Sequence, residues 1–188
     1  MAPPDELDTD ELLRRFLPGL RGFLRLRAGR LLLEKESCSD LAQSVCRDVL
    51  ENVGKLQLDG EESFRRWLYT TAARKIADRY EYYLAGRRNV NREADRHTGD
   101  DARTLEAYAG FYSPSQHAAA REELLRVEDA FARLRSEEQD VVLMAKMMGL
   151  SRQQIAAETG RSEAAVRKQL SRALARLTDM LATPEGDE

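Results

Sequence analysis

The amino-acid sequence predicts an all-α protein: two small helical domains joined by a flexible linker, the second with a helix-turn-helix. Leu, Ala, Arg and Glu dominate the 188 residues, aromatic residues are few, and no segment sustains the alternation of a half-buried strand. Residues 89–116 are polar and weakly periodic, which is typical of a tether. We expect one domain over residues 1–88, a linker over 89–116 with a short helix near 105–108, and a second domain over 117–188.

The first helix is predicted over residues 7–33, with a bend at Pro18-Gly19. Its arginines would also suit a helix on a membrane surface, but a core helix with a solvated basic face is the favoured interpretation. The residues expected to face inward are Leu12, Leu13, Phe16, Leu20, Phe23, Leu24 and Leu31.

A second helix follows, capped by Ser37 or Ser39. Its apolar stripe is predicted to be Leu41, Val45, Val49, Leu50 and Val53. A loop then leads to a third helix, predicted over residues 61–84. Its inward-facing residues are expected to be Phe64, Trp67, Leu68, Ala72 and Ile76. A lone tryptophan on the inner face of a helix usually belongs to the core, so Trp67 is not expected to stack on a base.

The second domain is predicted to begin with a helix from about residue 117, with an apolar stripe of Leu124, Val127, Phe131 and Leu134. Two capping boxes follow, Ser136-Glu-Glu-Gln139 and Ser151-Arg-Gln-Gln154. Gly160 stands where a left-handed turn residue is needed, and Ser162 caps the last helix. The inner face of that helix is expected to be Val166, Leu170, Ala173, Leu174 and Leu177.

The last two helices have the pattern of a helix-turn-helix. Ile155 and Ala156 should pack on Val166 and Leu170, and the small alanine lets the helices cross at a steep angle. The candidate DNA-binding residues on the outer face of the last helix are Glu163, Ala164, Arg167, Lys168, Ser171 and Arg172. Arginine and lysine hold phosphates or guanine edges, and Glu163 can accept a hydrogen bond from a cytosine amino group. The alternative is a plain helical hairpin with a solvated basic face.

Charge is unevenly distributed along the chain. The net charge is −3, and both termini are acidic. Residues 65–88 and 161–176 are mostly basic. Because local patches set the attraction to phosphates, the acidic total does not exclude nucleic-acid binding.

Several function classes are disfavoured. Cys38 and Cys46 form no CxxC and are not spaced with His97 and His117 as zinc ligands, so they are expected to be two partly buried thiols. No carboxylate cluster, phosphate-binding glycine loop or nucleophile motif is present, so we expect no enzyme, no cofactor and no metal. No apolar run approaches the ~20 residues of a membrane span, and the N-terminus lacks the apolar core of a secretion signal, so a cytoplasmic protein is expected.

The helix-turn-helix resembles that of a known family. Residues 149–177, GLSRQQIAAETGRSEAAVRKQLSRALARL, follow without a gap the pattern GLSxxEIAExLGxSxxTVKxRLxRARxxL. That pattern belongs to the promoter-reading domain of extracytoplasmic-function (ECF) sigma factors. The usual threonine before the valine is Ala165, which removes one phosphate-contacting hydroxyl. Response-regulator DNA-binding domains share the pattern, so this segment alone leaves both classes open.

Residues 63–83, SFRRWLYTTAARKIADRYEYY, favour the sigma factor. They resemble the SFxxWLYxIARNKIADYYRR of the first domain of ECF sigma factors, which faces the minus-ten promoter element and helps to melt it. The resemblance implies that Arg74, Lys75 and Arg79 hold the non-template strand. Two departures stand out: Ala73-Arg74 replaces the usual Arg-Asn, and Glu81-Tyr82-Tyr83 stands where arginine is common.

The second helix departs most from the family, in which it begins DAEDLxQExF and docks on the largest polymerase subunit. Residues 37–46 read SCSDLAQSVC here. The polymerase-binding residues that the resemblance implies are Ser37, Ser39, Asp40, Gln43 and Ser44. Serine occupies the three usually acidic positions. Three interpretations stay open: a neutral substitution, because serine also caps a helix; a phosphorylation switch at Ser37 or Ser39 that restores the charge; or a polymerase that has co-varied.

The resemblance thus implies a sigma factor that binds core RNA polymerase and directs it to promoter DNA, without catalysing a reaction. Its last helix would read the minus-thirty-five element, and its first domain would open the minus-ten element. An anti-sigma factor and a Ser/Thr protein kinase are the candidate regulators, and no membrane insertion is expected. The alternatives are a stand-alone helix-turn-helix regulator that needs no polymerase, and a sigma-like decoy.

Overall fold

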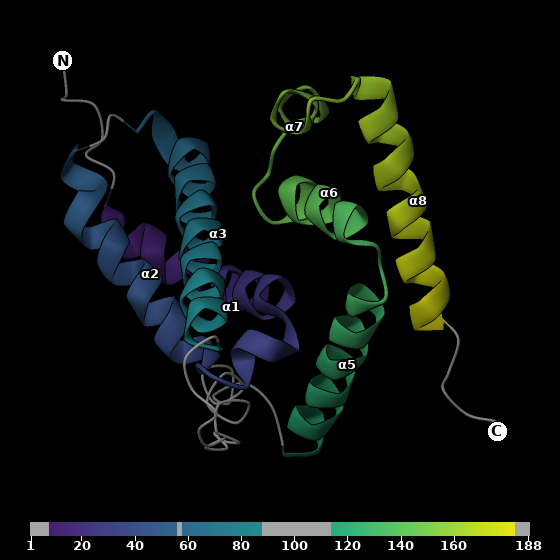
Figure 1. Cartoon of the computed structure of the whole chain (residues 1–188), viewed down its shortest axis with the longest axis horizontal. Helices are drawn as coiled ribbons and strands as arrows, with labels where there is room; N and C mark the ends of the chain where they lie inside the picture. Colours follow the sequence, from purple (N-terminus) through teal and green to yellow (C-terminus); the bar gives the residue numbers. More distant parts are fainter. Residues whose placement is uncertain (1–7, 56–57, 88–113, 183–188) are drawn as a thin grey trace. The chain divides into compact units, whose positions relative to one another are not determined.

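The computed structural model describes residues 8–55, 58–87 and 114–182 (Figure 1). All the regular elements in these ranges are helical, which confirms the all-α prediction. The chain divides into two compact units, Met1–Asp101 and Ala102–Glu188. Most of the predicted linker, including its short helix near residues 105–108, lies outside the described residues. In the part that is described, no helix is long and apolar enough to cross a membrane.

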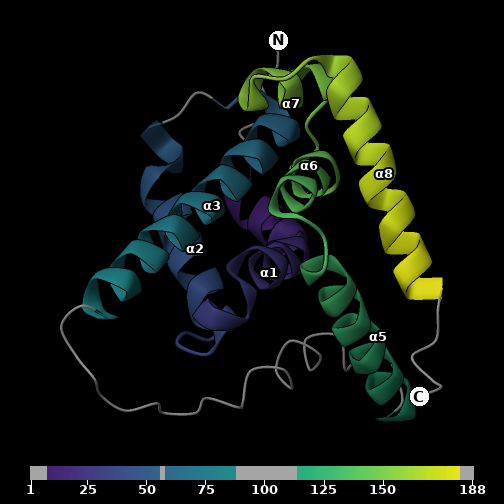
Figure 2. The ribbon, with the colours of Figure 1, turned by 45° about the vertical axis from the view of Figure 1, so that its right-hand side comes forward.

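Unit 1 is built from three packed helices, α1 (Thr9–Leu33), α2 (Cys38–Asn52) and α3 (Gly60–Arg87), with a 3-10 turn η1 (Val53–Lys55) after α2. Each of the three helices contacts the other two (Figures 1 and 2). Their buried faces supply the core, whose main members are Leu20, Phe23, Leu24, Leu41, Val45, Val49, Phe64, Leu68, Ala72 and Ile76. These ten were predicted to face inward as apolar stripes, whereas Ala28, Leu32 and Tyr69 are comparably buried and were not predicted.

The interruption of α1 lies at Gly29, and the predicted bend at Pro18-Gly19 is not where the backbone leaves the helical conformation. Gly29 has φ 63° and ψ 172°, a region open essentially to glycine alone. Gly19 has a different role: a Cβ there would lie 2.5 Å from the hydroxyl oxygen of buried Tyr69. Gly19 therefore provides space for a ring from α3.

Four inward predictions in unit 1 are wrong or incomplete, those for Phe16, Leu50, Val53 and Trp67, and the side chain of Leu31 lies outside the described residues. Leu50 is 53% exposed, because it follows buried Val49 and falls on the outer side of α2. Trp67 is only partly buried, although its ring meets that of Phe64 with centroids 6.2 Å apart. Cys38 and Ala42 fill the α2 face of the core instead, because small residues allow close helix packing.

Unit 2 contains α5 (Pro114–Ala132), α6 (Ser136–Lys146), α7 (Arg152–Thr159) and α8 (Glu163–Ala182). The helix predicted from about residue 117 starts three residues earlier. α8 packs against α5, α6 and α7 (Figure 2). The buried cluster is Val141, Leu150, Ile155 and Val166, with Met144, Ala145, Met148, Ala156 and Leu170 packed around it. This cluster confirms the predicted contact between the two helices of the helix-turn-helix.

The predicted caps around α7 and α8 are confirmed. Ser151 Oγ accepts from the Gln154 backbone N–H at 3.2 Å, and Gln154 Oε1 accepts from the Ser151 N–H at 2.8 Å. Gly160 ends α7 in the left-handed conformation with φ 64°. Ser162 Oγ accepts from the Ala165 N–H at 3.2 Å and so caps α8.

The capping box predicted at the start of α6 is displaced by one residue. Arg135 is the N-cap, Ser136 is already helical, and Glu138 Oε2 accepts from the Arg135 N–H at 3.3 Å. Gln139, the expected partner of Ser136, donates instead to the Phe131 carbonyl at 3.0 Å. The Glu138 carboxylate, which is 1% exposed, pairs with the side chains of Arg135 and Arg176.

Candidate polymerase and nucleic-acid surfaces

The outer face of α8 brings together all the residues predicted to contact DNA in unit 2. Glu163, Ala164, Arg167, Lys168, Ser171 and Arg172 are all exposed. Val166 and Ala173 lie on the opposite face and are fully buried. No described residue forms an ion pair with Arg167, Lys168 or Arg172. Their cationic groups are therefore available to phosphates or base edges.

The three cations predicted on α3 are in different situations. Arg74 is exposed. Lys75 Nζ lies 2.6 Å from Asp48 Oδ2 of α2, and only 19% of the lysine side chain is exposed. Arg79 Nε lies 3.2 Å from Glu36 Oε1, just before α2. Two of the three cations are thus paired with carboxylates of their own unit.

A surface hollow of about 280 Å³ lies beside these cations, between α2 and α3. Its walls are Asp48, Asn52, Trp67, Thr71, Arg74, Lys75 and Asp78. Trp67, Thr71, Arg74 and Asp78 recur every three or four residues, so they share one face of α3. That spacing was visible in the sequence and could have revealed Trp67 as a surface residue.

Serine residues begin the helix predicted to dock on polymerase. Ser37 is the N-cap of α2: its hydroxyl oxygen accepts from the Asp40 N–H at 3.0 Å. The same hydroxyl donates to Asp40 Oδ2 at 2.8 Å. Asp40 and Gln43 are exposed, whereas Ser39 and Ser44 are partly buried.

The outer side of α2 also carries a residue that sequence reasoning assigned to the core. Leu50 lies on the same helical line as Asp40, Gln43 and Arg47, at intervals of three and four residues. All four are exposed. We call Asp40, Gln43, Arg47 and Leu50 the α2 outer line. It combines charge, an amide and one large apolar group, a mixture suited to a protein interface.

Two family descriptions match the two units. Residues 12–83 match Sigma-70 region 2, and residues 124–177 match Sigma-70, region 4. The ECF RNA polymerase sigma factor SigD of Mycobacterium tuberculosis is 28% identical over 170 residues, which cover 90% of this chain and 74% of SigD. The chain belongs to the ECF sigma factors of the sigma-70 family. As a sigma factor it acts in transcription initiation.

Other relatives of this sigma factor agree with the assignment. RNA polymerase sigma factor CnrH of Cupriavidus metallidurans is 30% identical over 132 residues, which cover 65% of this chain and 63% of CnrH. A solved structure of CnrH in complex with the cytosolic domain of CnrY has a TM-score of 0.55 at 21% identity. The match covers 92% of this chain and 86% of the matched chain, and the likeness shows a shared fold.

Proposed function

We propose that this sigma factor binds core RNA polymerase and directs it to promoters that carry minus-ten and minus-thirty-five elements. Residues 1–88 would dock on polymerase and open the minus-ten element, and residues 117–188 would read the minus-thirty-five element. One observation carries the proposal: the part matching region 4 exposes a face of the second helix of its helix-turn-helix whose cations have no carboxylate partner among the described residues. A stand-alone regulator would not need the residues that match region 2.

The minus-thirty-five element would be read by α8 in the major groove. Arg167, Lys168 and Arg172 would hold phosphates or guanine edges, because their charges have no described partner. Glu163, in the first turn of α8, would accept from a cytosine amino group. Ser171 would donate to a base edge or a phosphate. The small side chain of Ala164 would let α8 approach the DNA closely.

The minus-ten element would contact α3. Arg74 is expected to contribute most of the three α3 cations, since Lys75 and Arg79 already neutralise Asp48 and Glu36. Trp67 and Thr71 border the same hollow and would offer an aromatic side chain and a hydroxyl to the DNA, contrary to the expectation that Trp67 does not contact a base. Trp67 and Thr71 are thus added to Arg74, Lys75 and Arg79 as proposed contacts with the minus-ten element.

The polymerase would dock on the start and outer side of α2. Asp40 and Gln43 would make polar contacts, and Leu50 would supply the apolar centre that the α2 outer line otherwise lacks. Ser37, Ser39 and Ser44 would lie in the same contact. An anti-sigma factor would have to cover this surface to prevent docking. Because its partner polymerase acts in the cytoplasm, we assign the protein to that compartment.

We further propose that a Ser/Thr protein kinase gates this docking by phosphorylating Ser37 or Ser39. A phosphate adds about −1.5 to −2 charge, and an anion at a helix N-terminus is stabilised by the helix dipole. Ser37 occupies that position on α2. At Ser37 the phosphate would replace the hydroxyl that now donates to Asp40, so its charge would add to that carboxylate on the docking surface. If the unmodified serines suffice, acidic replacements will not improve polymerase binding.

Transcription reconstituted with core polymerase of the same host tests the proposal. Promoters would first be selected from random duplexes by the assembled holoenzyme, using chain with Ser37→Asp/Ser39→Asp to remove any need for a kinase. We expect run-off transcripts that Arg167→Ala/Lys168→Ala reduces at least tenfold, since about 1.4 kcal/mol of lost contact gives that factor. Specific duplex binding by the chain alone, unaffected by added polymerase, would instead favour the stand-alone regulator.

A further inference from the structure

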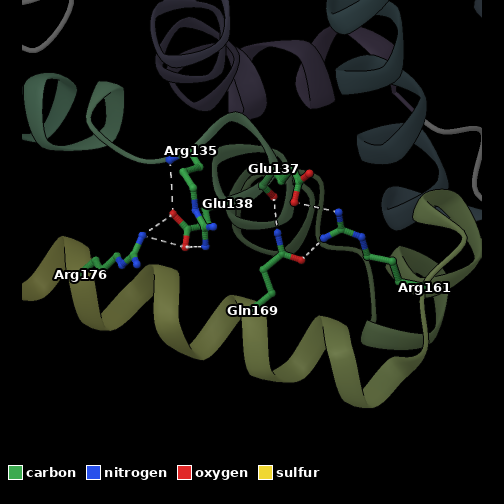
Figure 3. Close-up of polar contacts among 6 residues, drawn as sticks. All are labelled: Arg135, Glu137, Glu138, Arg161, Gln169 and Arg176. Carbon is green, nitrogen blue, oxygen red and sulfur yellow. Dashed lines mark hydrogen bonds and ion pairs between the residues drawn. The ribbon is translucent and has the colours of Figure 1, made fainter.

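A polar network joins the first turn of α6 to α8 and to the turn that precedes α8 (Figure 3). Arg161 Nη2 donates to Glu137 Oε2 at 2.9 Å, and Arg161 Nη1 donates to Gln169 Oε1. Gln169 Nε2 donates to the Glu137 carbonyl at 2.9 Å. The three residues form a closed ring of hydrogen bonds, so both terminal nitrogens of Arg161 have protein partners.

A second anchor lies two helical turns further along α8. Arg176 Nη1 donates to both carboxylate oxygens of Glu138, at 3.1 and 3.0 Å (Figure 3). Glu138 is 1% exposed and is the one buried charged residue in the described part of the chain. Gln169 and Arg176 are seven residues apart, roughly 10 Å along the helix axis. Two fixed points at that separation determine both the rotation and the tilt of α8 against α6.

We propose that Arg161 and Arg176 are positioning residues: they hold the recognition helix on α6 and do not contact DNA. The inference rests on the proposed reading of promoter DNA by α8. In the sequence both arginines belong to the same basic stretch as Arg167, Lys168 and Arg172, so composition alone would count all five as phosphate contacts. The structure separates the stretch into cations paired with protein carboxylates and cations without a described partner.

The apolar core beneath α8 does not by itself fix the rotation of the helix on α6. Val166 and Leu170 pack on Ile155, but apolar contact is non-directional and tolerates small rotations of a helix. Hydrogen bonds have defined lengths and angles, and those made by charged groups are the stronger ones. The network therefore sets which α8 residues point outward, and base readout depends on that register.

Salt dependence distinguishes a positioning arginine from a phosphate contact. Each phosphate neutralised on duplex DNA contributes about 0.9 to the slope of log K against log salt. The holoenzyme of the full chain, carrying Ser37→Asp/Ser39→Asp in every variant, would be titrated with a selected minus-thirty-five duplex at several salt concentrations. Arg167→Ala should lower the slope by about 0.9. Arg161→Ala should weaken binding about two- to fivefold at fixed salt and leave the slope unchanged.

A charge-reversed pair completes the test. Glu137→Arg/Arg161→Glu keeps the net charge and rebuilds the ion pair in the opposite sense but not the hydrogen bond from residue 161 to Gln169 Oε1, so it should recover part of the affinity lost in Arg161→Ala. Arg176→Gln keeps a donor toward Glu138 and should also leave the slope unchanged. Thermal unfolding of each variant would confirm that the helices remain folded.

The inference is overturned if Arg161→Ala lowers the slope as Arg167→Ala does, or if the reversed pair is folded but recovers no affinity. The first result would make Arg161 a DNA contact, and the second would show that its pairing with Glu137 does not position α8. A different pattern marks failure of the proposed function: the parent holoenzyme would select no duplex, and Arg167→Ala would change nothing. In that case both the proposed reading of DNA by α8 and the positioning role of Arg161 and Arg176 would be rejected.

Discussion

Gly29 divides α1 at a conformation that other residues rarely adopt. Its φ and ψ of 63° and 172° end the regular helix after Ala28, whose carbonyl accepts a hydrogen bond from the Tyr80 hydroxyl of α3. A side-chain donor therefore satisfies a carbonyl that lies next to the interruption. The interruption and the Tyr80 hydrogen bond form one local feature that joins α1 to α3.

Replacing Gly29 by alanine should destabilise unit 1 by about 1–3 kcal/mol, because alanine is strained at this φ and ψ. Trp67 is the only tryptophan of the chain, so its fluorescence during denaturant unfolding reports on unit 1. Gly54→Ala is the control: a Cβ there meets no atom within 4 Å and φ is not positive. A Gly29→Ala variant as stable as Gly54→Ala would show that the strain is absent.

Glu138 is a buried carboxylate with three donors around it. The Arg135 side chain donates to it at 3.0 Å, and the Arg135 backbone and Arg176 donate as well. The hydrogen bond from Arg135 is the main reason that the pKa of Glu138 lies below its usual value of 4.5, and burial partly opposes this effect. A lowered folded-state pKa means that the ionised group stabilises the fold above about pH 4.5 and loses this effect as the pH falls toward the lowered pKa.

Glu138→Gln should therefore destabilise unit 2 at pH 7, by about 1.5–3 kcal/mol for the lost charge-assisted hydrogen bonds. The difference from the parent should shrink as the pH drops below 4.5. Hydrogen exchange of α6 and α8 amides at several pH values measures both effects. A difference that stays constant down to pH 3 would contradict the assigned ionised role.

Two α2-side carboxylates pair with cations of α3 and would compete with DNA for them. Asp48 holds Lys75 at 2.6 Å, and Glu36 holds Arg79 at 3.2 Å. The Tyr83 hydroxyl also donates to Glu36 at 3.1 Å, and burial together with this hydrogen bond raises the pKa of Tyr83. The pairs join α3 to α2 and reduce the charge that α3 offers to a phosphate backbone.

Asp48→Asn should strengthen binding of the holoenzyme to a single-stranded minus-ten oligonucleotide and steepen its salt slope by about 0.7, since Lys75 is released to one phosphate. Glu51→Gln is the matched control: it removes the same charge from an exposed position of α2 for which the structure describes no partner. Equal effects of the two variants on affinity would mean that Lys75 does not reach the strand.

Helices whose faces differ clearly in polarity were predictable from the sequence, and features that depend on neighbours were not. Most of the large core residues of α1 to α3 and the α7–α8 contact follow from helical periodicity, and the caps at Ser37, Ser151 and Ser162 follow from local chemistry. The pairing of Glu138 with Arg176 joins residues 38 positions apart in the sequence, so no local pattern reveals it.

Part of the candidate site could also be predicted from the sequence. The outward residues of α8 follow from one helical period, and all of them are exposed. Whether a cation is unpaired or held by a carboxylate depends on contacts between helices, as at Lys75 and Arg161. The exposure of Leu50 was missed because an apolar residue beside Val49 was assigned to the same stripe.

The whole chain carries a net charge of −3, and yet the described part exposes Arg74 on α3 and a face of α8 whose cations have no described carboxylate partner. An isolated acidic protein gains little long-range attraction to DNA. Polymerase binding would bring both faces to the promoter together, so the second contact would form at a high effective concentration. Docking through α2 is therefore the step on which the proposed function depends.

The affinity of the full chain for core RNA polymerase of its own host, by fluorescence anisotropy at fixed salt, tests that step most directly. We predict that Ser37→Asp/Ser39→Asp binds core polymerase at least about tenfold more tightly than the unmodified chain, a gain of about 1.4 kcal/mol. Leu50→Asp in that background should abolish the gain, whereas Leu125→Asp, at an exposed leucine of unit 2, should not. Equal, tight binding by the serine and aspartate forms would rule out control by a kinase but would still support polymerase binding by a sigma factor. Failure of both forms to bind would contradict the account.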